Sequence, residues 1–276
     1  MDLNQHVVLI TGASRGLGRA FAQALAHRGA RVAITARSAD VLQQTVTELN
    51  HAPDQILAIP ADVTDLDATS HVIATVEAQL GPITALINNA GQFRAFGPIG
   101  VVDPTRWWRE LEVNLRGPFL YTHVVLPLMR TRATGRIINV ASGAGLGTIP
   151  LASAYNVSKT ALIRFTETLA QEIAGSGVHA FAIHPGTVRT PMNAYVHDSP
   201  EVAAQAPQIQ QWFHTLYAEQ QDTPIEQAVA LVVRLVQGDA DVLSGWYLSV
   251  DDDLSALVQQ HTTAPQADQR TLRMQF

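Results

Sequence analysis

A glycine-rich segment near the start of the chain constrains the fold more than any other feature. His6–Thr11 (HVVLIT) has the composition of a buried strand, and TGASRGLG (Thr11–Gly18) leads from it directly into a helical pattern. A strand, a tight glycine turn and a helix in this order form the setting in which a glycine fingerprint binds a dinucleotide. Gly12 permits the turn, Gly16 lets the backbone approach a pyrophosphate, and Gly18 allows the helix to pack closely on the strand. Free amides at the helix N-terminus then face the phosphates, so the segment predicts a nucleotide site.

Short apolar strands alternate with longer helical patterns along most of the chain. Most strands are apolar at consecutive positions, which is typical of a parallel sheet covered on both faces. The alternation predicts an α/β fold of the Rossmann type, with a doubly wound, mostly parallel sheet of seven strands and helices on both faces. We expect strands at 6–11, 30–36, 55–62, 83–91, 135–142, 178–186 and 246–250, and helices at 17–27, 39–50, 66–80, 107–132 and 154–174.

The absence of repeats and linkers favours one domain, which we place at residues 1–260. The segment 190–224 has no strand pattern and contains several aromatic side chains. Insertions beyond the carboxyl ends of strands lie over the ligand crevice, so we expect a substrate lid there. The alternative is a helical excursion that packs for stability. Residues 261–276 are polar, and our hypothesis is a C-terminal tail that docks at a subunit interface.

Composition excludes several classes of partner. The chain has 18 basic and 24 acidic side chains without a basic stripe, which argues against nucleic acid and anionic membrane. It has no cysteine, which excludes disulfides and thiolate metal sites. The N-terminus lacks a basic region and an apolar core long enough for a signal peptide, and no apolar stretch reaches membrane-spanning length. We therefore expect a soluble, cytoplasmic protein.

The segment Ser153–Leu162 (SAYNVSKTAL) contains the strongest candidate for chemistry. Tyr155 and Lys159 are four residues apart in a helical pattern, so they lie on one face, one turn apart. Ser142 lies thirteen residues before Tyr155, at the carboxyl end of a predicted strand, which is the ligand edge of such a sheet. Taken alone, the pair could be two polar tips on an amphipathic helix, and the serine an ordinary turn residue.

These motifs, with the glycine spacing Gly-x-x-x-Gly-x-Gly, resemble the short-chain dehydrogenase/reductase family in its single-domain form. Ser142, Tyr155 and Lys159 match its Ser–Tyr-x-x-x-Lys arrangement, and Asn114 in EVNLRGPF matches its helix asparagine. The resemblance implies that Tyr155 is the general acid/base and that Lys159 also holds the nicotinamide ribose. It further implies that Ser142 holds the substrate oxygen and that Asn114 supports a water in a proton relay.

The chemistry of carbonyl reduction fits this arrangement. Hydride transfer to a carbonyl leaves negative charge on its oxygen, so a proton donor must be aimed there. The pKa of tyrosine is normally about 10. We expect the ammonium of Lys159 and a positive nicotinamide ring to lower the pKa of Tyr155 by favouring the phenolate.

Other segments match cofactor-binding parts of the family. The resemblance places Asp62 and Val63 at the adenine, and Val188 and Thr190 at the nicotinamide carboxamide. Asn88-Asn89-Ala90-Gly91 matches its Asn-Asn-Ala-Gly motif, in which we expect Asn88 to be structural. The predicted cofactor residues are Gly12, Ser14, Arg15, Gly16, Leu17, Gly18, Arg37, Asp62, Val63, Asn89, Ala90, Gly91, Tyr155, Lys159, Pro185, Gly186, Val188 and Thr190.

The end of the second predicted strand bears on the choice between NADP and NAD. NAD sites place an acid there to bind the ribose 2′-hydroxyl, but this strand ends at Ala36. Arg37 follows, and Arg15 lies in the glycine loop, so two guanidinium groups can converge on a 2′-phosphate, with Ser14 as a further donor. We therefore predict NADP rather than NAD. The alternative is that either arginine is a solvated surface charge.

The chain departs from the family after its last predicted strand. The family commonly has Val-Asp-Gly-Gly there, whereas this chain has SVDDDLSALV, Ser249–Val258. The adjacent aspartates suggest either a metal site or a helix cap, and we favour the cap because acids suit a helix N-terminus. His179 and His184 lack the setting of a metal cluster and are interpreted as packing or surface residues. We predict no catalytic metal.

The sequence thus predicts an oxidoreductase that transfers a hydride between NADP(H) and a small-molecule carbonyl or secondary alcohol. Two alternatives stay open: an epimerase or dehydratase with a tightly held cofactor, and a non-catalytic NADP-binding sensor. The resemblance implies a homodimer or homotetramer. Candidates for a partly apolar substrate wall are Leu146, Ile149, Met192, Tyr195, Trp212 and Tyr217.

Overall fold

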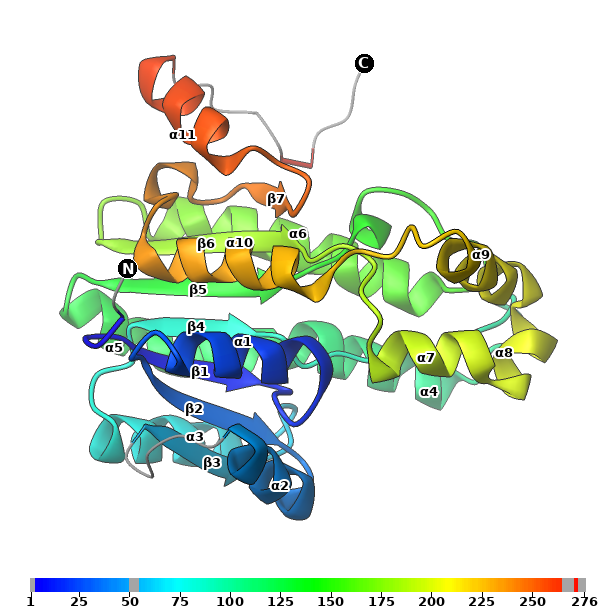
Figure 1. Cartoon of the computed structure of the whole chain (residues 1–276), viewed down its shortest axis with the longest axis horizontal. Helices are drawn as coiled ribbons and strands as arrows, with labels where there is room; N and C mark the ends of the chain where they lie inside the picture. Colours follow the sequence, from blue (N-terminus) through cyan, green and yellow to red (C-terminus); the bar gives the residue numbers. More distant parts are fainter. Residues whose placement is uncertain (1–2, 50–54, 265–270, 273–276) are drawn as a thin grey trace.

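A parallel β-sheet forms the centre of the protein. The computed structural model describes residues 3–49, 55–264 and 271–272. The strands are β1 (Val7–Thr11), β2 (Arg31–Ala36), β3 (Ile56–Pro60), β4 (Ala85–Asn88), β5 (Gly135–Val140), β6 (Val178–His184) and β7 (Tyr247–Ser249). They pair in the order β3-β2-β1-β4-β5-β6-β7, and every pairing is parallel (Figure 1). The order reverses between β1 and β4, so ligands are expected in the crevice at the carboxyl ends of these two strands.

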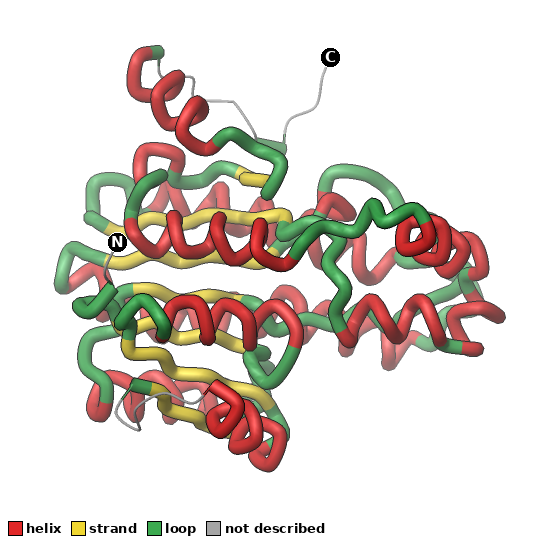
Figure 2. Tube along the Cα trace, in the orientation of Figure 1, coloured by secondary structure: helices red, strands yellow, loops and turns green. Residues whose placement is uncertain are grey.

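Helices cover both faces of the sheet, as predicted (Figure 2). The helices are α1 (Gly16–Ala26), α2 (Ala39–Leu49), α3 (Leu66–Gln79), α4 (Pro104–Leu111), α5 (Gly117–Thr131), α6 (Ser153–Glu172), α7 (Pro191–Asp198), α8 (Pro200–Gln205), α9 (Pro207–Ala218), α10 (Ile225–Gln237) and α11 (Leu254–Thr263). Buried apolar side chains of α1, α2 and α10 pack against one face, and those of α3, α5 and α6 against the other. The predicted doubly wound α/β fold is therefore confirmed.

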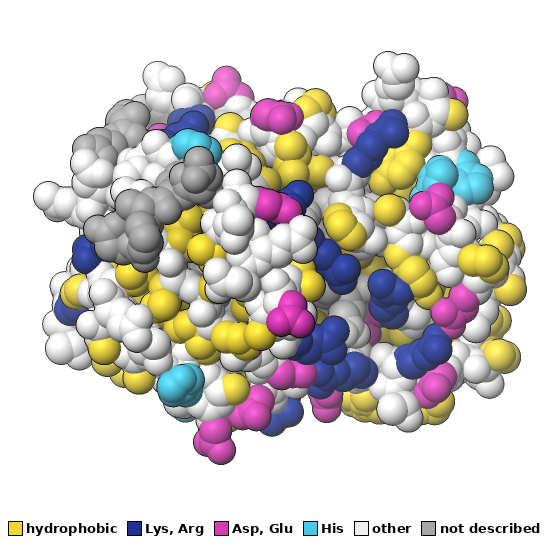
Figure 3. Space-filling model, turned by 60° about the horizontal axis from the view of Figure 1, so that its bottom comes forward, with side chains coloured by type: hydrophobic (Ala, Val, Ile, Leu, Met, Phe, Trp, Pro, Cys, Tyr) yellow, Lys and Arg dark blue, Asp and Glu magenta, His cyan; other side chains and the backbone are white. Residues whose placement is uncertain are grey.

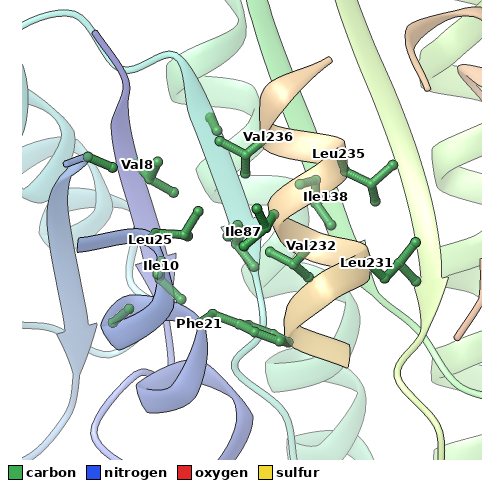
Figure 4. Close-up of a cluster of buried hydrophobic side chains, with 14 of the residues drawn as sticks. Val8, Ile10, Phe21, Leu25, Ile87, Ile138, Leu231, Val232, Leu235 and Val236 are labelled. Atoms are coloured by element: carbon green, nitrogen blue, oxygen red, sulfur yellow. The ribbon is translucent and has the colours of Figure 1, made fainter. Parts of the chain in front are cut away.

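The consecutive apolar residues of the strands explain this two-sided burial. Alternate side chains of a strand point to opposite faces, so a strand that is covered on both faces must be apolar throughout. Figure 4 shows one face, where Ile10, Ile87 and Ile138 from three strands meet Phe21 of α1 and Val232 of α10. Full burial of such a side chain contributes about 1.5–3 kcal/mol. This packing fixes the carboxyl ends of the strands at one edge.

One segment predicted as a single continuous helix is interrupted in the structure. The segment predicted as a helix at 107–132 consists of α4, a π-helical turn at Glu112–Arg116, and α5. Asp103 starts α4 earlier, since its carboxylate accepts a hydrogen bond from the amide of Thr105 at 2.7 Å. Pro118 has no amide hydrogen to continue the regular ladder, which accounts for the change of helix type beside it. The predicted strands at 83–91 and 246–250 are also too long, because their outer residues leave the ladder and form loops.

The segment 190–224 lies beyond the carboxyl ends of the strands, where α7, α8 and α9 project from the sheet together with α4 (Figure 1). Val196, Ile209 and Phe213 from these helices form an apolar cluster of their own with Phe93 and Phe96. The segment therefore lies at the ligand edge and also has a packed core. Its closure over a substrate stays a prediction.

The aspartates after β7 cap a helix, as predicted. The Asp253 carboxylate accepts a hydrogen bond from the amide of Ala256 at 3.0 Å and so begins α11. Asp252 accepts one from the amide of Ser249 at 2.7 Å. Most of the tail at 261–276 lies outside the described residues, although the amide of Leu272 donates to Glu167 of α6 in the same chain at 2.5 Å. Within the described chain no helix is both long enough and apolar enough to cross a membrane.

Candidate active site

The glycine loop after β1 is pressed against the end of β4. Gly12 has φ +66°, and a Cβ atom at this position would lie 2.6 Å from the Cα atom of Ala90. At Gly18 a Cβ atom would lie 2.5 Å from Nδ2 of Asn89. Distances this short exclude any side chain, so the approach of the two loops requires glycine at both positions. The Asn89 side chain closes the junction by donating to the carbonyl oxygens of Thr11 at 2.9 Å and of Gly12 at 3.1 Å.

A pocket of about 430 Å³ lies along this junction at the carboxyl edge of the sheet. It runs from the glycine loop and Arg37 to Tyr155 and Lys159 on α6. Every predicted cofactor residue lines it except Gly18, which is buried beneath the loop. The glycine cradle and the length of this lining fit a nicotinamide dinucleotide.

Arginine side chains mark one end of the pocket. Arg15 and Arg37 both line it, and within the described chain neither forms an ion pair. Ala36, at the end of β2, adds no carboxylate beside them. Figure 3 shows Lys and Arg side chains gathered around a hollow in one face of the molecule. This end of the pocket can therefore accept an anionic group.

Asp62 lies on the pocket wall as an ionised carboxylate. Burial by itself would raise the pKa of Asp62, but hydrogen bonds from Thr64 and the guanidinium of Arg109 outweigh it and hold the pKa below its usual value. Arg109 donates to Oδ2 at 2.5 Å, and the amide of Thr64 donates to Oδ1 at 3.0 Å. Each carboxylate oxygen has two lone pairs, so the group can still accept a further hydrogen bond.

The other end of the pocket brings together Ser142, Tyr155 and Lys159. Tyr155 and Lys159 lie one turn apart on α6, and Nζ of Lys159 is 5.6 Å from the centroid of the Tyr155 ring. Nζ also donates to the carbonyl oxygen of Val140 at 2.7 Å, which ties α6 to the end of β5. Ser142 follows the same strand. A phenol, an ammonium and a hydroxyl thus converge on one side of the pocket.

The protein's own groups shift these pKa values in directions that the sequence did not reveal. Burial raises the pKa of Tyr155 to about 12; the neighbouring Ser142 hydroxyl opposes this shift and the charge of Glu110 adds to it. Burial lowers the pKa of Lys159 to about 8, while Glu110 works in the opposite direction. The expected lowering of the Tyr155 pKa is therefore wrong for the protein groups alone, because desolvation of the phenolate dominates.

Asn114 lies beside the pocket rather than in its wall. It belongs to the π-helical turn, is fully buried, and holds the loop after β4 through both functional groups of its amide. Its Oδ1 accepts from the amide of Gln92 at 2.7 Å, and its Nδ2 donates to the carbonyl oxygen of Gln92 at 2.9 Å. Nδ2 also donates to Oγ of Ser158 at 3.0 Å, which connects the loop to α6. The relay role of Asn114 stays a prediction.

Sequence reasoning missed Glu110, one turn before Asn114. Its side chain is 0% exposed, and its Oε2 accepts hydrogen bonds from the amides of Arg94 at 2.6 Å and Ala95 at 2.9 Å. Its Oε1 is buried with no hydrogen-bond partner among the described residues. Burial raises the pKa of Glu110 to about 7, against the pull of those two amides and of the positive charge of Lys159. The signal was the four-residue spacing from Asn114, which puts both side chains on one side of the helix.

Among the residues of the pocket wall that sequence reasoning missed, Phe93 and His184 lie at its reacting end. Phe93 lines the pocket, and its ring centroid is 4.3 Å from that of Tyr155. His184, interpreted as a packing or surface residue, lines the pocket, and its Nδ1 accepts from the amide of Gly143 at 3.3 Å. Its place at the carboxyl end of β6, directly before Pro185, was the available signal. His179 instead lies 3.6 Å from Asp241, outside the pocket lining.

The residues predicted for the substrate wall lie in different places in the structure. Met192 lines the pocket, and Tyr195 lines a second cavity beside it. Leu146 and Trp212 line neither of these two cavities and are 58% and 51% exposed, so their contact with a substrate stays a prediction that the cavities do not support. On α9 the neighbouring Phe213 occupies the inner face, which leaves Trp212 on the outer one. Ile149 and Tyr217 pack against the apolar cluster of α7–α9.

Comparisons with known proteins agree with this geometry. Residues 6–201 match the family model described as short chain dehydrogenase. A short chain dehydrogenase of Pseudocercospora fijiensis is 34% identical over 94% of this chain and 84% of its own. The 2-(R)-hydroxypropyl-CoM dehydrogenase of Xanthobacter autotrophicus is 39% identical over 72% of this chain and 81% of its own. A crystal structure of an actinorhodin polyketide ketoreductase with NADPH superposes with a TM-score of 0.81 at 29% identity, covering 92% of this chain and 99% of that one.

The pKa of Lys159 can be measured without overlap, because Lys159 is the only lysine in the sequence. We expect its ammonium to titrate at about pH 8, since burial disfavours the charge. In Glu110→Gln the midpoint should fall further, because the negative charge of Glu110 raises the Lys159 pKa. NMR titration of protein labelled with nitrogen-15 lysine measures both values. A midpoint near the usual value of about 10.4 in the wild type would contradict the assignment.

Glu110 should make the free energy of unfolding depend on pH. Its pKa is about 7 in the folded protein against 4.5 ordinarily, so the folded state keeps a proton that the unfolded state releases. Its contribution to stability is therefore complete below about pH 4.5 and declines as the pH rises to about 7. In urea unfolding at about pH 5 and about pH 8, the stability of wild type relative to Glu110→Gln should fall by up to about 3 kcal/mol. A difference that does not change with pH would refute this.

Proposed function

Because the chain belongs to the short chain dehydrogenase family, we propose that it is an NADP-dependent oxidoreductase that interconverts a carbonyl compound and a secondary alcohol. The observation that carries this proposal is the convergence of Ser142, Tyr155 and Lys159 on the pocket that the glycine cradle also lines. The relatives and the solved structure named above are dehydrogenases and a ketoreductase, which supports the same class of reaction.

The residues of the pocket suggest how the cofactor would be held. The amides after Gly12 would bind the pyrophosphate, and Arg15 and Arg37 would pair with a 2′-phosphate. Lys159 would donate to the nicotinamide ribose, and Thr190 to the carboxamide. When bound, the cofactor supplies or accepts the hydride.

Tyr155 then acts on the oxygen of the substrate. A phenol whose pKa lies near 12 is protonated at neutral pH, so it is ready to donate a proton to the developing alkoxide. The Ser142 hydroxyl donates a hydrogen bond to the same oxygen and fixes its position. Lys159, with a pKa of about 8, can give up and regain a proton near neutral pH, which suits it to restore the proton of Tyr155. In the oxidative direction Tyr155 has to be a phenolate, which its buried setting disfavours without an added positive charge.

Tyr155→Phe removes the proton donor and retains the ring. We expect kcat for carbonyl reduction to fall by about 10²–10⁴-fold, the usual contribution of general acid catalysis, while NADPH affinity persists. Steady-state kinetics and fluorescence titration with NADPH measure the two quantities. Tyr121→Phe is the matched control, because Tyr121 is buried in the core between the sheet and its helices and lies outside the pocket lining. Unchanged turnover in Tyr155→Phe would remove Tyr155 as the acid, and NADPH binding by a wild type without any turnover would favour the sensor alternative.

Arg37→Gln tests the choice of cofactor. The loss of one guanidinium that pairs with the 2′-phosphate should lower kcat/KM for NADPH by about 10–100-fold, because a charge-assisted hydrogen bond contributes about 1.5–3 kcal/mol. NADH lacks this phosphate, so its kcat/KM serves as the internal control and should change little. If the wild-type enzyme used NADH more efficiently than NADPH, the preference for NADP would be wrong.

A further inference from the structure

Arg94, in the loop between β4 and α4, is exposed and forms no direct ion pair with the described residues. Its guanidinium carbon lies 3.3 Å from the centroid of the Tyr195 ring, and the described residues provide no ion pair for it. The Tyr195 hydroxyl donates to Glu201 at 2.7 Å, which fixes the ring. An arginine that stacks on an aromatic face keeps its N–H edge available for a planar anion.

A second cavity of about 430 Å³ lies beside the active-site pocket. Arg94 and Gln92 line both spaces, so the two are adjacent at these residues. Arg106 and Arg109 also line the second cavity, but Arg106 pairs with Glu201 and Arg109 pairs with Asp62. Arg94 is therefore the one arginine of this cavity without a direct ion pair to a described residue, although Glu201, which also lines the cavity, and buried Glu110 interact with its charge at longer range.

The position of Arg94 is fixed relative to the reacting end of the pocket. Phe93 precedes it and packs on Tyr155 with 4.3 Å between ring centroids. Arg94 and Tyr155 both line the active-site pocket, so one small molecule bound there can contact both side chains. The backbone of Arg94 is held by the 2.6 Å hydrogen bond from its amide to buried Glu110. The side chain thus projects from a constrained backbone.

We propose that Arg94 binds a carboxylate of the substrate, so that the substrates of this enzyme are small oxo acids and the corresponding hydroxy acids. The planar guanidinium can bind a carboxylate through two parallel hydrogen bonds, which sets the distance between the carboxylate and the reacting carbonyl. In the reductive direction the carbonyl carbon gains the hydride, its oxygen gains the proton of Tyr155, and the carboxylate is unchanged. This inference rests on the proposed function and adds the class of substrate to it.

The test uses straight-chain oxo acids of increasing length, each paired with its methyl ester, with NADPH as the reductant. For wild type we expect kcat/KM to favour the acid over its ester by at least about tenfold at the best chain length. In Arg94→Gln this ratio should fall by at least about tenfold, mainly through KM for the acid, and Arg94→Lys should restore part of it. Arg130→Gln, an exposed arginine on α5, is the matched control and should keep the wild-type ratio.

The outcomes separate this inference from the proposed function. Equal acid-to-ester ratios in wild type and Arg94→Gln would overturn the carboxylate site, while reduction of the esters would still support the proposed function. If neither acids nor esters are reduced, the proposed function fails, and calorimetry of oxo-acid binding to wild type and Arg94→Gln decides the carboxylate site. Binding weakened at least about tenfold by the substitution would support it, and binding that is absent or equal in both would overturn it.

Discussion

The site depends on one close junction, where the loop after β1 meets the end of β4. Oγ1 of Thr11 accepts hydrogen bonds from the amides of Asn89 and Ala90, each at 3.0 Å, while the Asn89 side chain binds back to the carbonyl oxygens of Thr11 and Gly12. Two strands that are adjacent in the sheet but 78 residues apart in the chain thereby become a single surface. Gly12 and Gly18 are required because any side chain there would separate the two loops.

A second set of polar contacts carries this organisation to the reacting end of the pocket. Glu110 lies near the end of α4, and Asn114 lies one turn later in the π-helical turn. Both side chains form hydrogen bonds with the backbone of the loop that follows β4. That loop places Phe93 against Tyr155, and Asn114 extends the connection to Ser158 on α6. Because Glu110 and Lys159 are buried, each charge here acts strongly on its neighbours. The buried carboxyl of Glu110 therefore influences the proton affinities of Tyr155 and Lys159 while also stabilising the loop.

Prediction from the sequence was most successful where a local pattern has one structural solution. The consecutive apolar residues of the strands predicted the two-sided sheet, and the roles of Asn88 and Asp253 were confirmed: Asn88 is buried and donates to Asn139 at 2.8 Å, and Asp253 caps α11. Sequence reasoning could not place Leu146 and Trp212 relative to the pocket, because the lining of a pocket depends on which face of a helix or turn is covered by other segments. Glu110 was overlooked since an acid between two tryptophans and an asparagine resembles an exposed helix residue until the loop folds over it.

The sequence by itself indicated the family, the seven strands of a parallel sheet, and the presence of the glycine and Tyr-x-x-x-Lys motifs, because these follow from side-chain periodicity and from spacings along one element. Only the tertiary structure decided the pKa values in the site and which residues from distant loops join it. Burial raises the pKa of Tyr155 to about 12 and lowers that of Lys159 to about 8, and neither shift can be read from residues four apart on a helix. Desolvation depends on every segment packed around a group, and Arg94, Glu110 and Tyr195 meet only when loops distant in the sequence come together.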